Sequence, residues 1–146
     1  MKVAQAMSSN VSVANPTQTI REVAGTMAKV DAGVVPVADG DRLVGMITDR
    51  DIAIRAVAAG KGPETPVREV MTPEVKYCFE DEDLDHVAKN MAEQRVRRLP
   101  VMNRDKRLVG ILSLGDIALS PAKKPAAEAL RGVSQQGGPH TQTAPA

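Results

Sequence analysis

The sequence contains two copies of one pattern, and this repeat limits the possible folds more than any other feature. Residues 45–51, Gly-Met-Ile-Thr-Asp-Arg-Asp, recur 65 positions later as residues 110–116, Gly-Ile-Leu-Ser-Leu-Gly-Asp. Upstream of these stretches, further blocks recur in the same order: Arg42-Leu43-Val44 with Arg107-Leu108-Val109, Pro36-Val37 with Pro100-Val101, Val23-Ala24 with Val87-Ala88, and Val3 and Met7 with Val67 and Met71. From the Pro-Val block upstream the spacing is 64, and one residue inserted in the loop 103–106 accounts for the change. Ordered agreement with a single insertion indicates a duplicated structural unit.

Each copy predicts the same succession of elements: strand, helix, strand, strand, helix. In the first copy Thr19 caps a helix that ends near Val30, with Glu22 placed for a capping box. A β-branched strand over 33–37, an Asp-Gly turn and a second strand over 42–48 form a hairpin, and a helix follows over 49–59. In the second copy the corresponding segments are an apolar helix face from Leu84 to Met91, strands over 98–102 and 107–112, and a helix from Gly115. The fold class is therefore α/β, more narrowly α+β.

These elements define the expected domains. The first domain spans 1–60, a Gly- and Pro-rich linker spans 61–66, and the second domain spans 67–120. A unit of about 60 residues buries only about 60% of its unfolded surface, so we expect the two copies to share a core. Repeated Pro and Gly residues break the pattern in 121–146, which we expect to be a mobile tail.

Composition excludes several classes of function. With 19 basic and 18 acidic residues the formal charge is +1, which gives no general attraction to nucleic acid or an anionic membrane. No apolar run approaches the roughly 20 residues of a spanning helix. Cys78 is the single cysteine, which predicts a chain without intrachain disulfides in a reducing, cytoplasmic setting. His86 and His140 do not have metal-site spacing relative to Cys78, and no nucleophile elbow or Walker loop is present.

The repeated pattern resembles a known family. Two units, each opening on Val-x-x-x-Met, carrying a Pro-Val strand and closing on Leu-Val-Gly-x-hydrophobic-[Thr/Ser]-x-x-Asp-Ile-Ala, are similar to a tandem pair of CBS domains, a Bateman module. The resemblance covers residues 1 to about 119 and is closest to freestanding prokaryotic signalling proteins. It implies two subdomains packed with pseudo-twofold symmetry through their sheets, a homodimer formed through helices, and an adenosine-containing ligand such as AMP, ADP, ATP, NAD or S-adenosylmethionine. No other cofactor is implied.

The resemblance also implies which residues line two ligand clefts between the copies. One cleft combines Thr48 and Asp51 with Arg97, Arg98 and the region of Lys76 and Tyr77. The other combines Ser113 and Asp116 with Val34, Val35 and residues 8–12. Arg50 lies beside Asp51, whereas the second copy has Gly115 at this position, so we expect the first cleft to bind phosphate groups better.

Each of these residues also has a purely structural interpretation. A carboxylate such as Asp51 accepts two hydrogen bonds at once, which matches the two vicinal hydroxyls of ribose, but Thr48 and Asp51 can equally cap a helix. Arg97 and Arg98 can hold phosphate oxygens, or together with Arg95 they can pair with the acidic run 80–85 as a surface network. Tyr77 can stack on adenine or simply cover apolar residues.

Three functional hypotheses follow. The first is a regulatory, energy- or redox-sensing module in which an adenine nucleotide changes how the copies or subunits pack, and a client protein detects the change. The alternative is a structural or interaction dimer with vestigial clefts and no nucleotide ligand. An enzyme ranks last, because no general base, nucleophile or metal cluster is visible in the sequence.

Overall fold

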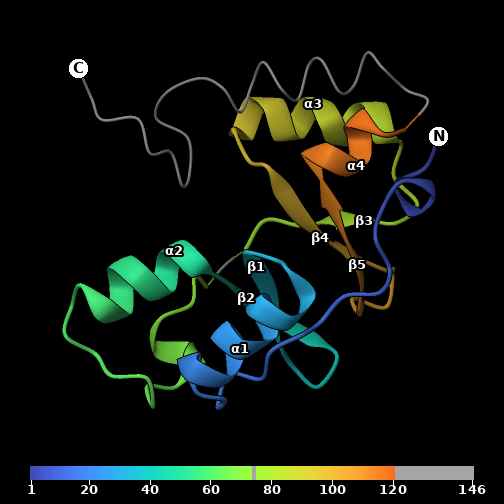
Figure 1. Ribbon diagram of the computed structural model, residues 1–146. Coiled ribbons are helices and arrows are strands. Elements are labelled where there is room, and N and C mark those ends of the chain that lie inside the picture. Colours follow the sequence, from blue (N-terminus) through green and yellow to red (C-terminus); the bar gives the residue numbers. More distant parts are fainter. Residues whose placement is uncertain (74, 121–146) are drawn as a thin grey trace, which may run out of the picture. The chain divides into compact units, whose positions relative to one another are not determined.

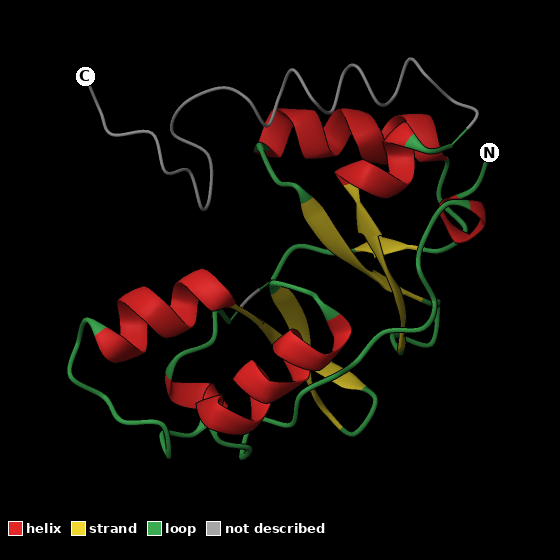
Figure 2. Cartoon of the chain, in the orientation of Figure 1, coloured by secondary structure: helices red, strands yellow, loops and turns green. Residues whose placement is uncertain are grey.

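The computed structural model describes residues 1–73 and 75–120 of the 146-residue chain (Figure 1). The tail predicted over 121–146 lies outside the described residues. Helices and strands alternate along the chain as η1 (Val3–Gln5), α1 (Ile20–Val30), β1 (Val34–Asp39), β2 (Arg42–Thr48), α2 (Asp49–Asp51), η2 (Ile52–Val57), η3 (Val67–Glu69), β3 (Cys78–Phe79), α3 (Leu84–Gln94), β4 (Arg98–Met102), β5 (Leu108–Ser113) and α4 (Leu114–Ala118). The predicted mixed α+β class is confirmed (Figure 2). None of the described helices has the length and apolar character needed to cross a membrane.

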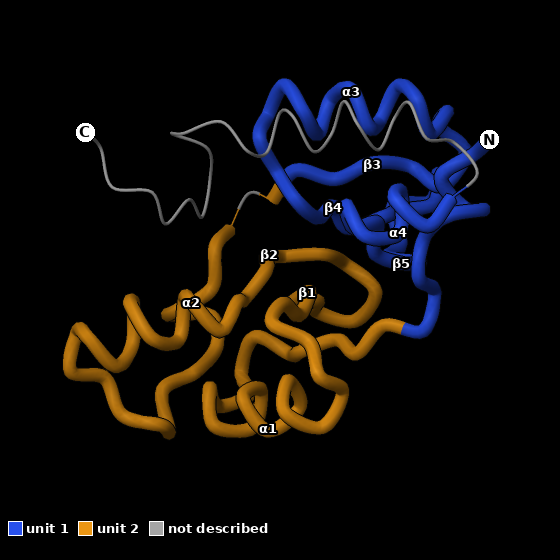
Figure 3. Tube along the Cα trace, turned by 45° about the horizontal axis from the view of Figure 1, so that its top comes forward, with its two compact units in different colours: residues 1–10, 76–146 blue, residues 11–75 orange. Residues whose placement is uncertain are grey.

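The chain divides into two compact units, whose boundaries do not coincide with the sequence repeats (Figure 3). One unit, called here unit 2, consists of residues 11–75. The other, unit 1, consists of residues 1–10 together with the chain from residue 76 onward. The opening segment of each repeat therefore belongs to the unit that is built mainly from the other repeat.

Unit 2 is built on the hairpin of β1 and β2. The two strands pair antiparallel from Val34 opposite Thr48 to Asp39 opposite Arg42, with a register shift after Val37. Helix α1 starts where Thr19 Oγ1 accepts a hydrogen bond from the Glu22 backbone N–H at 3.2 Å, which confirms the predicted cap. The predicted capping box is not completed, because the Glu22 carboxylate accepts a hydrogen bond from Gln18 Nε2 at 3.3 Å instead. The buried residues of its core come from both repeats: Ala14, Ile20, Val23, Met27, Val35, Val37, Ile47, Ala56, Val67 and Val70.

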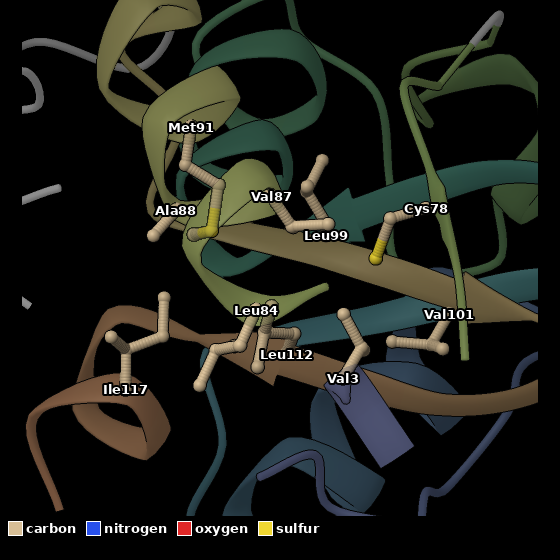
Figure 4. Packing of buried hydrophobic residues seen from close by; sticks show 10 residues of the cluster. All are labelled: Val3, Cys78, Leu84, Val87, Ala88, Met91, Leu99, Val101, Leu112 and Ile117. Atoms are coloured by element: carbon tan, nitrogen blue, oxygen red, sulfur yellow. The ribbon is translucent and has the colours of Figure 1, made fainter. Parts of the chain in front are cut away.

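Unit 1 repeats this plan with a three-stranded sheet in the order β3-β4-β5. Strand β3 runs parallel to β4, and β4 pairs antiparallel with β5 from Arg98 opposite Ser113 onward. Helices α3 and α4 pack their apolar sides on this sheet, and Val3 from the opening segment completes the core (Figure 4). The buried residues are Val3, Cys78, Leu84, Val87, Ala88, Met91, Leu99, Val101, Leu112 and Ile117. Instead of the one shared core that we predicted, there are two cores, and each draws residues from both repeats.

Two local predictions need correction. The strand expected at the start of each half is only the two-residue β3 in the second half, and in the first half it is an isolated bridge between Ala14 and Val37. The helix expected over 49–59 begins as the α-helical turn α2 but continues as a π-helix, η2. The Val-x-x-x-Met segments themselves form the short 3₁₀ turns η1 and η3.

Candidate functional site

The corner between β2 and α2 holds the first pair of predicted site residues. Thr48 is extended, with φ −117° and ψ 161°, and its Oγ1 accepts a hydrogen bond from the Asp51 N–H at 2.9 Å. In return, Asp51 Oδ2 accepts one from the Thr48 N–H at 3.0 Å. This is a reciprocal capping box, which satisfies two backbone donors at the helix start. The capping role that the sequence left open is therefore real.

Capping does not use the whole carboxylate of Asp51. The residue is 6% exposed, and it is the one charged side chain among the buried residues of the described chain. Asp51 Oδ1 has no hydrogen-bond partner among the described residues. Every side-chain oxygen or nitrogen there that is shielded from solvent does have a partner. Oδ1 must therefore remain open to solvent. A nearly buried carboxylate with one open oxygen is suited to accept hydroxyl donors from a ligand.

The second copy has the same corner with one difference. Ser113 Oγ accepts a hydrogen bond from the Asp116 N–H, and Asp116 Oδ2 accepts one from the Ser113 N–H, both at 3.0 Å. Here, however, the hydroxyl of Ser8 lies 3.5 Å from Asp116 Oδ1, so this oxygen already faces a donor from the opening segment. The counterpart of Ser8 is Thr72, which forms no such contact with Asp51 in the described chain. The two carboxylates thus differ in how much hydrogen-bonding capacity they keep.

Arg97 and Arg98 are exposed in unit 1, and the described residues give their guanidinium groups no ion-pair partner. In the alternative interpretation these two arginines would pair, together with Arg95, with the acidic run 80–85, and neither Arg97 nor Arg98 forms such an ion pair in the described chain. Asp81 of that run instead pairs with Arg104 at 2.7 Å. Arg98 lies directly opposite Ser113 in the β4–β5 ladder, where facing side chains stand on the same side of a sheet. The strand register therefore places Arg98 beside the Ser113 corner of its own unit, and its side chain is exposed there.

Tyr77, the predicted adenine-stacking residue, is 45% exposed. Its ring meets Phe79 edge to face, with centroids 5.6 Å apart and an interplanar angle of 86°. Arg104 stacks on the Phe79 ring, with Cζ 4.0 Å from its centroid. Tyr77 thus packs against Phe79 in a T-shaped pair, and nearly half of the Tyr77 surface remains exposed to solvent.

The remaining predicted site residues differ in accessibility. Lys76 and Arg50 are exposed. Val35 is 1% exposed and belongs to the core of unit 2, so only its backbone can meet a ligand. The structure therefore brings together Thr48 with Asp51, and Ser8 with Ser113 and Asp116. It assigns Lys76, Tyr77, Arg97 and Arg98 to unit 1, so their combination with Asp51 of unit 2 stays a prediction.

One residue in the helix that follows the first corner, Arg55, was not predicted from the sequence. Arg55 lies four positions after Asp51 and donates to the carbonyls of Val70 and Met71. Comparison of the repeats carried a signal, because the position equivalent to Arg55 is Ser120. In the described chain no three His, Cys, Asp or Glu side chains gather in a way that could hold a metal ion.

The fold and the two corners define a class of protein: a tandem pair of small α+β units, each with a hydroxyl and a carboxylate that cap the helix after its β-hairpin. The CBS domain family model matches residues 3–57 and again 67–122. The chain therefore belongs to the CBS domain family, and the predicted tandem pair is confirmed.

Relatives of similar length share this organisation. The CBS domain-containing protein YhcV of Bacillus subtilis is 38% identical over 135 residues, which cover 92% of this chain and 96% of that protein. A crystal structure of Hypoxic Response Protein I with two coordinated zinc ions superposes with a TM-score of 0.73 at 35% identity, over 81% of this chain and 97% of that one. The CBS domain pair of protein MJ0100, in complex with 5′-methylthioadenosine and S-adenosyl-L-methionine, gives 0.72 at 34% identity, with coverage of 81% and 97%.

Proposed function

We propose that this protein is a regulatory module that binds an adenosine-containing ligand at the Thr48–Asp51 corner. The observation that carries the proposal is the open Oδ1 of a carboxylate that is otherwise buried and fixed by its own cap. The two ribose hydroxyls can donate to Oδ1 and to the second lone pair of Oδ2 without disturbing the capping box. The MJ0100 domain pair supports the ligand class, because it is solved with two adenosine compounds.

Phosphate recognition is assigned to arginine side chains. Arg97 and Arg98 are exposed and form no ion pair in the described chain. Arg50 lies within the Thr48–Asp51 corner, directly before Asp51. A planar guanidinium matches two phosphate oxygens at once, which favours AMP, ADP, ATP or NAD over an uncharged nucleoside. We propose that Arg97 and Arg98, with Lys76 and Tyr77, complete the Asp51 site. The register of Arg98 opposite Ser113 supports a rival arrangement in which Arg98 serves the Asp116 site.

Calorimetric titration tests the proposal. AMP, ADP, ATP, NAD and S-adenosylmethionine are each titrated into the full chain, and at least one should give saturable heat. Asp51→Ala should weaken the stronger binding event far more than Asp116→Ala does. Asp116→Ala is the matched control, because it removes an equivalent capping box from the other corner. Absence of heat with all five compounds would refute the function.

A double-mutant cycle then decides which corner Arg98 serves. If Arg98→Ala and Asp51→Ala affect binding of the same nucleotide non-additively, the two residues act on one ligand. Non-additivity with Asp116→Ala instead would assign Arg98 to the second corner. Full additivity with both variants would exclude Arg98 from ligand binding.

A homodimer is part of the proposal, as is an unidentified client protein in the cytoplasm. Ile54 is 53% exposed and Leu119 is 89% exposed, although both are large and apolar. They occupy equivalent positions in the two repeats, 65 residues apart, so both units present an apolar residue at the same place. Exposed apolar residues of this kind favour association. Light scattering should give twice the chain mass for the wild type and a lower mass for Ile54→Lys with Leu119→Lys. A monomeric wild type would exclude the dimer.

The alternative, an interaction dimer without a ligand, makes the opposite forecast for Asp51. It expects Asp51→Ala to leave client binding unchanged and to alter only stability. The proposal assigns no catalytic step to the chain, since it requires only a ligand that binds two arrangements with different affinity.

A further inference from the structure

Arg55 connects the helix of the Thr48–Asp51 corner to the exchanged opening segment of the second repeat. It lies in η2, which continues directly from the capped turn α2. Its Nη1 donates to the carbonyl oxygen of Met71 at 3.0 Å and of Val70 at 3.3 Å. One guanidinium therefore binds two consecutive carbonyls, and bonds from a charged donor are stronger than those between neutral groups.

The segment that Arg55 holds is fixed to unit 2 at its other contacts. Val67 and Val70 are fully buried. Thr72 exchanges backbone hydrogen bonds with Met46 of β2, at 2.8 and 3.0 Å. Strand β2 ends two residues later at Thr48, the capping residue. Asp51 and Arg55 are thus linked along one helix, Arg55 is hydrogen-bonded to residues 70 and 71, and residue 72 is paired with the strand that leads back to Thr48, all within one unit.

The winding of η2 is a second feature that sets this helix apart. Its backbone bonds span five residues, as from the Ala58 N–H to the Ala53 carbonyl at 2.9 Å. π-helical turns are rare and concentrate at functional sites. The equivalent helix of the second repeat, α4, is α-helical. At the position equivalent to Arg55, Ser120 donates its hydroxyl to the carbonyl of Ile117, in its own helix, at 2.6 Å.

We propose that Arg55 is a positioning residue that couples occupancy of the Asp51 carboxylate to the anchoring of residues 67–72, the segment from which the chain continues into unit 1. The proposal rests on the proposed ligand site for its biological meaning. The coupling itself is a property of the ligand-free chain. A ligand that stiffens the corner strengthens the grip of Arg55 on the two carbonyls, and loss of that grip loosens the corner in return.

Hydrogen exchange of the Val70, Met71 and Thr72 amides measures the anchoring without any ligand. Arg55→Gln should speed their exchange about tenfold, since a charge-assisted anchor is lost. Arg68→Gln is the control: Arg68 is in the same segment and carries the same charge, and its side chain forms no hydrogen bond in the described structure. Arg55→Lys keeps a charged donor and should restore most of the protection. Equal exchange in Arg55→Gln and Arg68→Gln would overturn the proposal.

A double-mutant cycle separates coupling from a merely structural role. If Arg55 carries the influence of Asp51, then Asp51→Ala speeds exchange at residues 70–72 in the wild-type background and adds little in Arg55→Gln. Strictly multiplicative effects would overturn the coupling.

AMP is then added to wild type and to Arg55→Gln. We expect AMP to protect residues 48–51 from hydrogen exchange in both proteins and residues 70–72 in the wild type alone. Protection of residues 70–72 in both proteins would contradict the proposal. If AMP does not bind, the result counts against AMP as the proposed ligand, while the ligand-free cycle still decides the role of Arg55.

Discussion

Replacement of Gly45 by alanine should destabilise unit 2, because the exchanged segment lies where the new methyl group would stand. A Cβ built on Gly45 falls 2.7 Å from the Met71 sulfur and 2.8 Å from the Thr72 carbonyl oxygen. The thioether can rotate away, but the carbonyl cannot, since it accepts the hydrogen bond from the Met46 N–H at 3.0 Å. The added methyl group must therefore push the two backbone segments apart.

The magnitude follows from the cost of overpacking. Inserting a methyl group into a packed interior costs about 1–3 kcal/mol, and the lower chain entropy of unfolded alanine returns about 0.4–1 kcal/mol. We expect Gly45→Ala to lower the free energy of unfolding by about 1–2 kcal/mol. Gly110→Ala should act similarly on unit 1, where the new Cβ would lie 2.7 Å from the Ser8 carbonyl oxygen. Gly25→Ala is the matched control: it lies in α1 with nothing within 4 Å, so it should stabilise by about 0.5–1 kcal/mol.

Urea unfolding followed by circular dichroism gives these free energies, provided that the slope with denaturant is the same in all variants. Hydrogen exchange assigns each loss to its unit: Gly45→Ala should loosen Thr72, and Gly110→Ala should loosen Ser8. If Gly45→Ala proves as stable as Gly25→Ala, the close approach of residues 71 and 72 to β2 is wrong. The packing of the second repeat's opening segment against β2 would then no longer be supported by this steric contact.

Three further perturbations test other parts of the structure. Burial, aided by the charge of Glu82, raises the pKa of the Cys78 thiol to about 12, so a thiol reagent at pH 8 should label it far faster in denaturant than in the native protein. The unfolded thiol ionises near its ordinary pKa of 9.0, whereas the folded thiol keeps its proton up to about pH 12. The Cys78 thiol therefore leaves the free energy of unfolding unchanged below pH 9 and lowers it as the pH rises from 9 toward 12, which unfolding at pH 8 and 10 can measure. The hydrogen bond from Arg104 holds the pKa of the Asp81 carboxyl below its ordinary value, so Arg104→Gln should shift the NMR titration of Asp81 to higher pH; an unchanged midpoint would contradict the pairing. Thr19→Ala should cost about 1 kcal/mol of unfolding free energy and Thr19→Asn almost nothing, because asparagine still caps the helix.

Local chemistry explains why much of the fold could be predicted from the sequence. Caps at Thr19, Thr48 and Ser113 form within three residues, so the hydroxyl and its backbone partner are fixed by one turn of chain. The hairpins follow from β-branched runs with a turn between them. Because the pattern is duplicated, each element could be predicted from two stretches of sequence. The π-helical winding of η2 could not be found in this way, because it coincides with bonds from Arg55 to a segment 15 and 16 residues away.

The candidate site was only partly predictable for the same reason. Spacing placed Thr48 and Asp51 together and indicated both a cap and a ligand, but only the structure shows that one carboxylate oxygen of Asp51 is left over. Val35 was predicted as a ligand residue from the family resemblance, and its side chain is buried in the core of unit 2, which leaves only its backbone for a ligand. The alternation of a strand does not by itself say which face is covered when the covering segment comes from a distant part of the chain.

Exchange of the opening segments makes the two repeats depend on one another for stability. Val3 belongs to the first repeat but is fully buried in unit 1, while Val67 and Val70 belong to the second repeat and are fully buried in unit 2. Each buried valine contributes about 1.5–3 kcal/mol, a large part of the stability of a unit of this size. A single repeat would lack the segment that completes its core and would expose its own. Any change at the Asp51 corner that reaches residues 67–72 therefore acts on a segment that belongs to the second repeat and completes the core of unit 2.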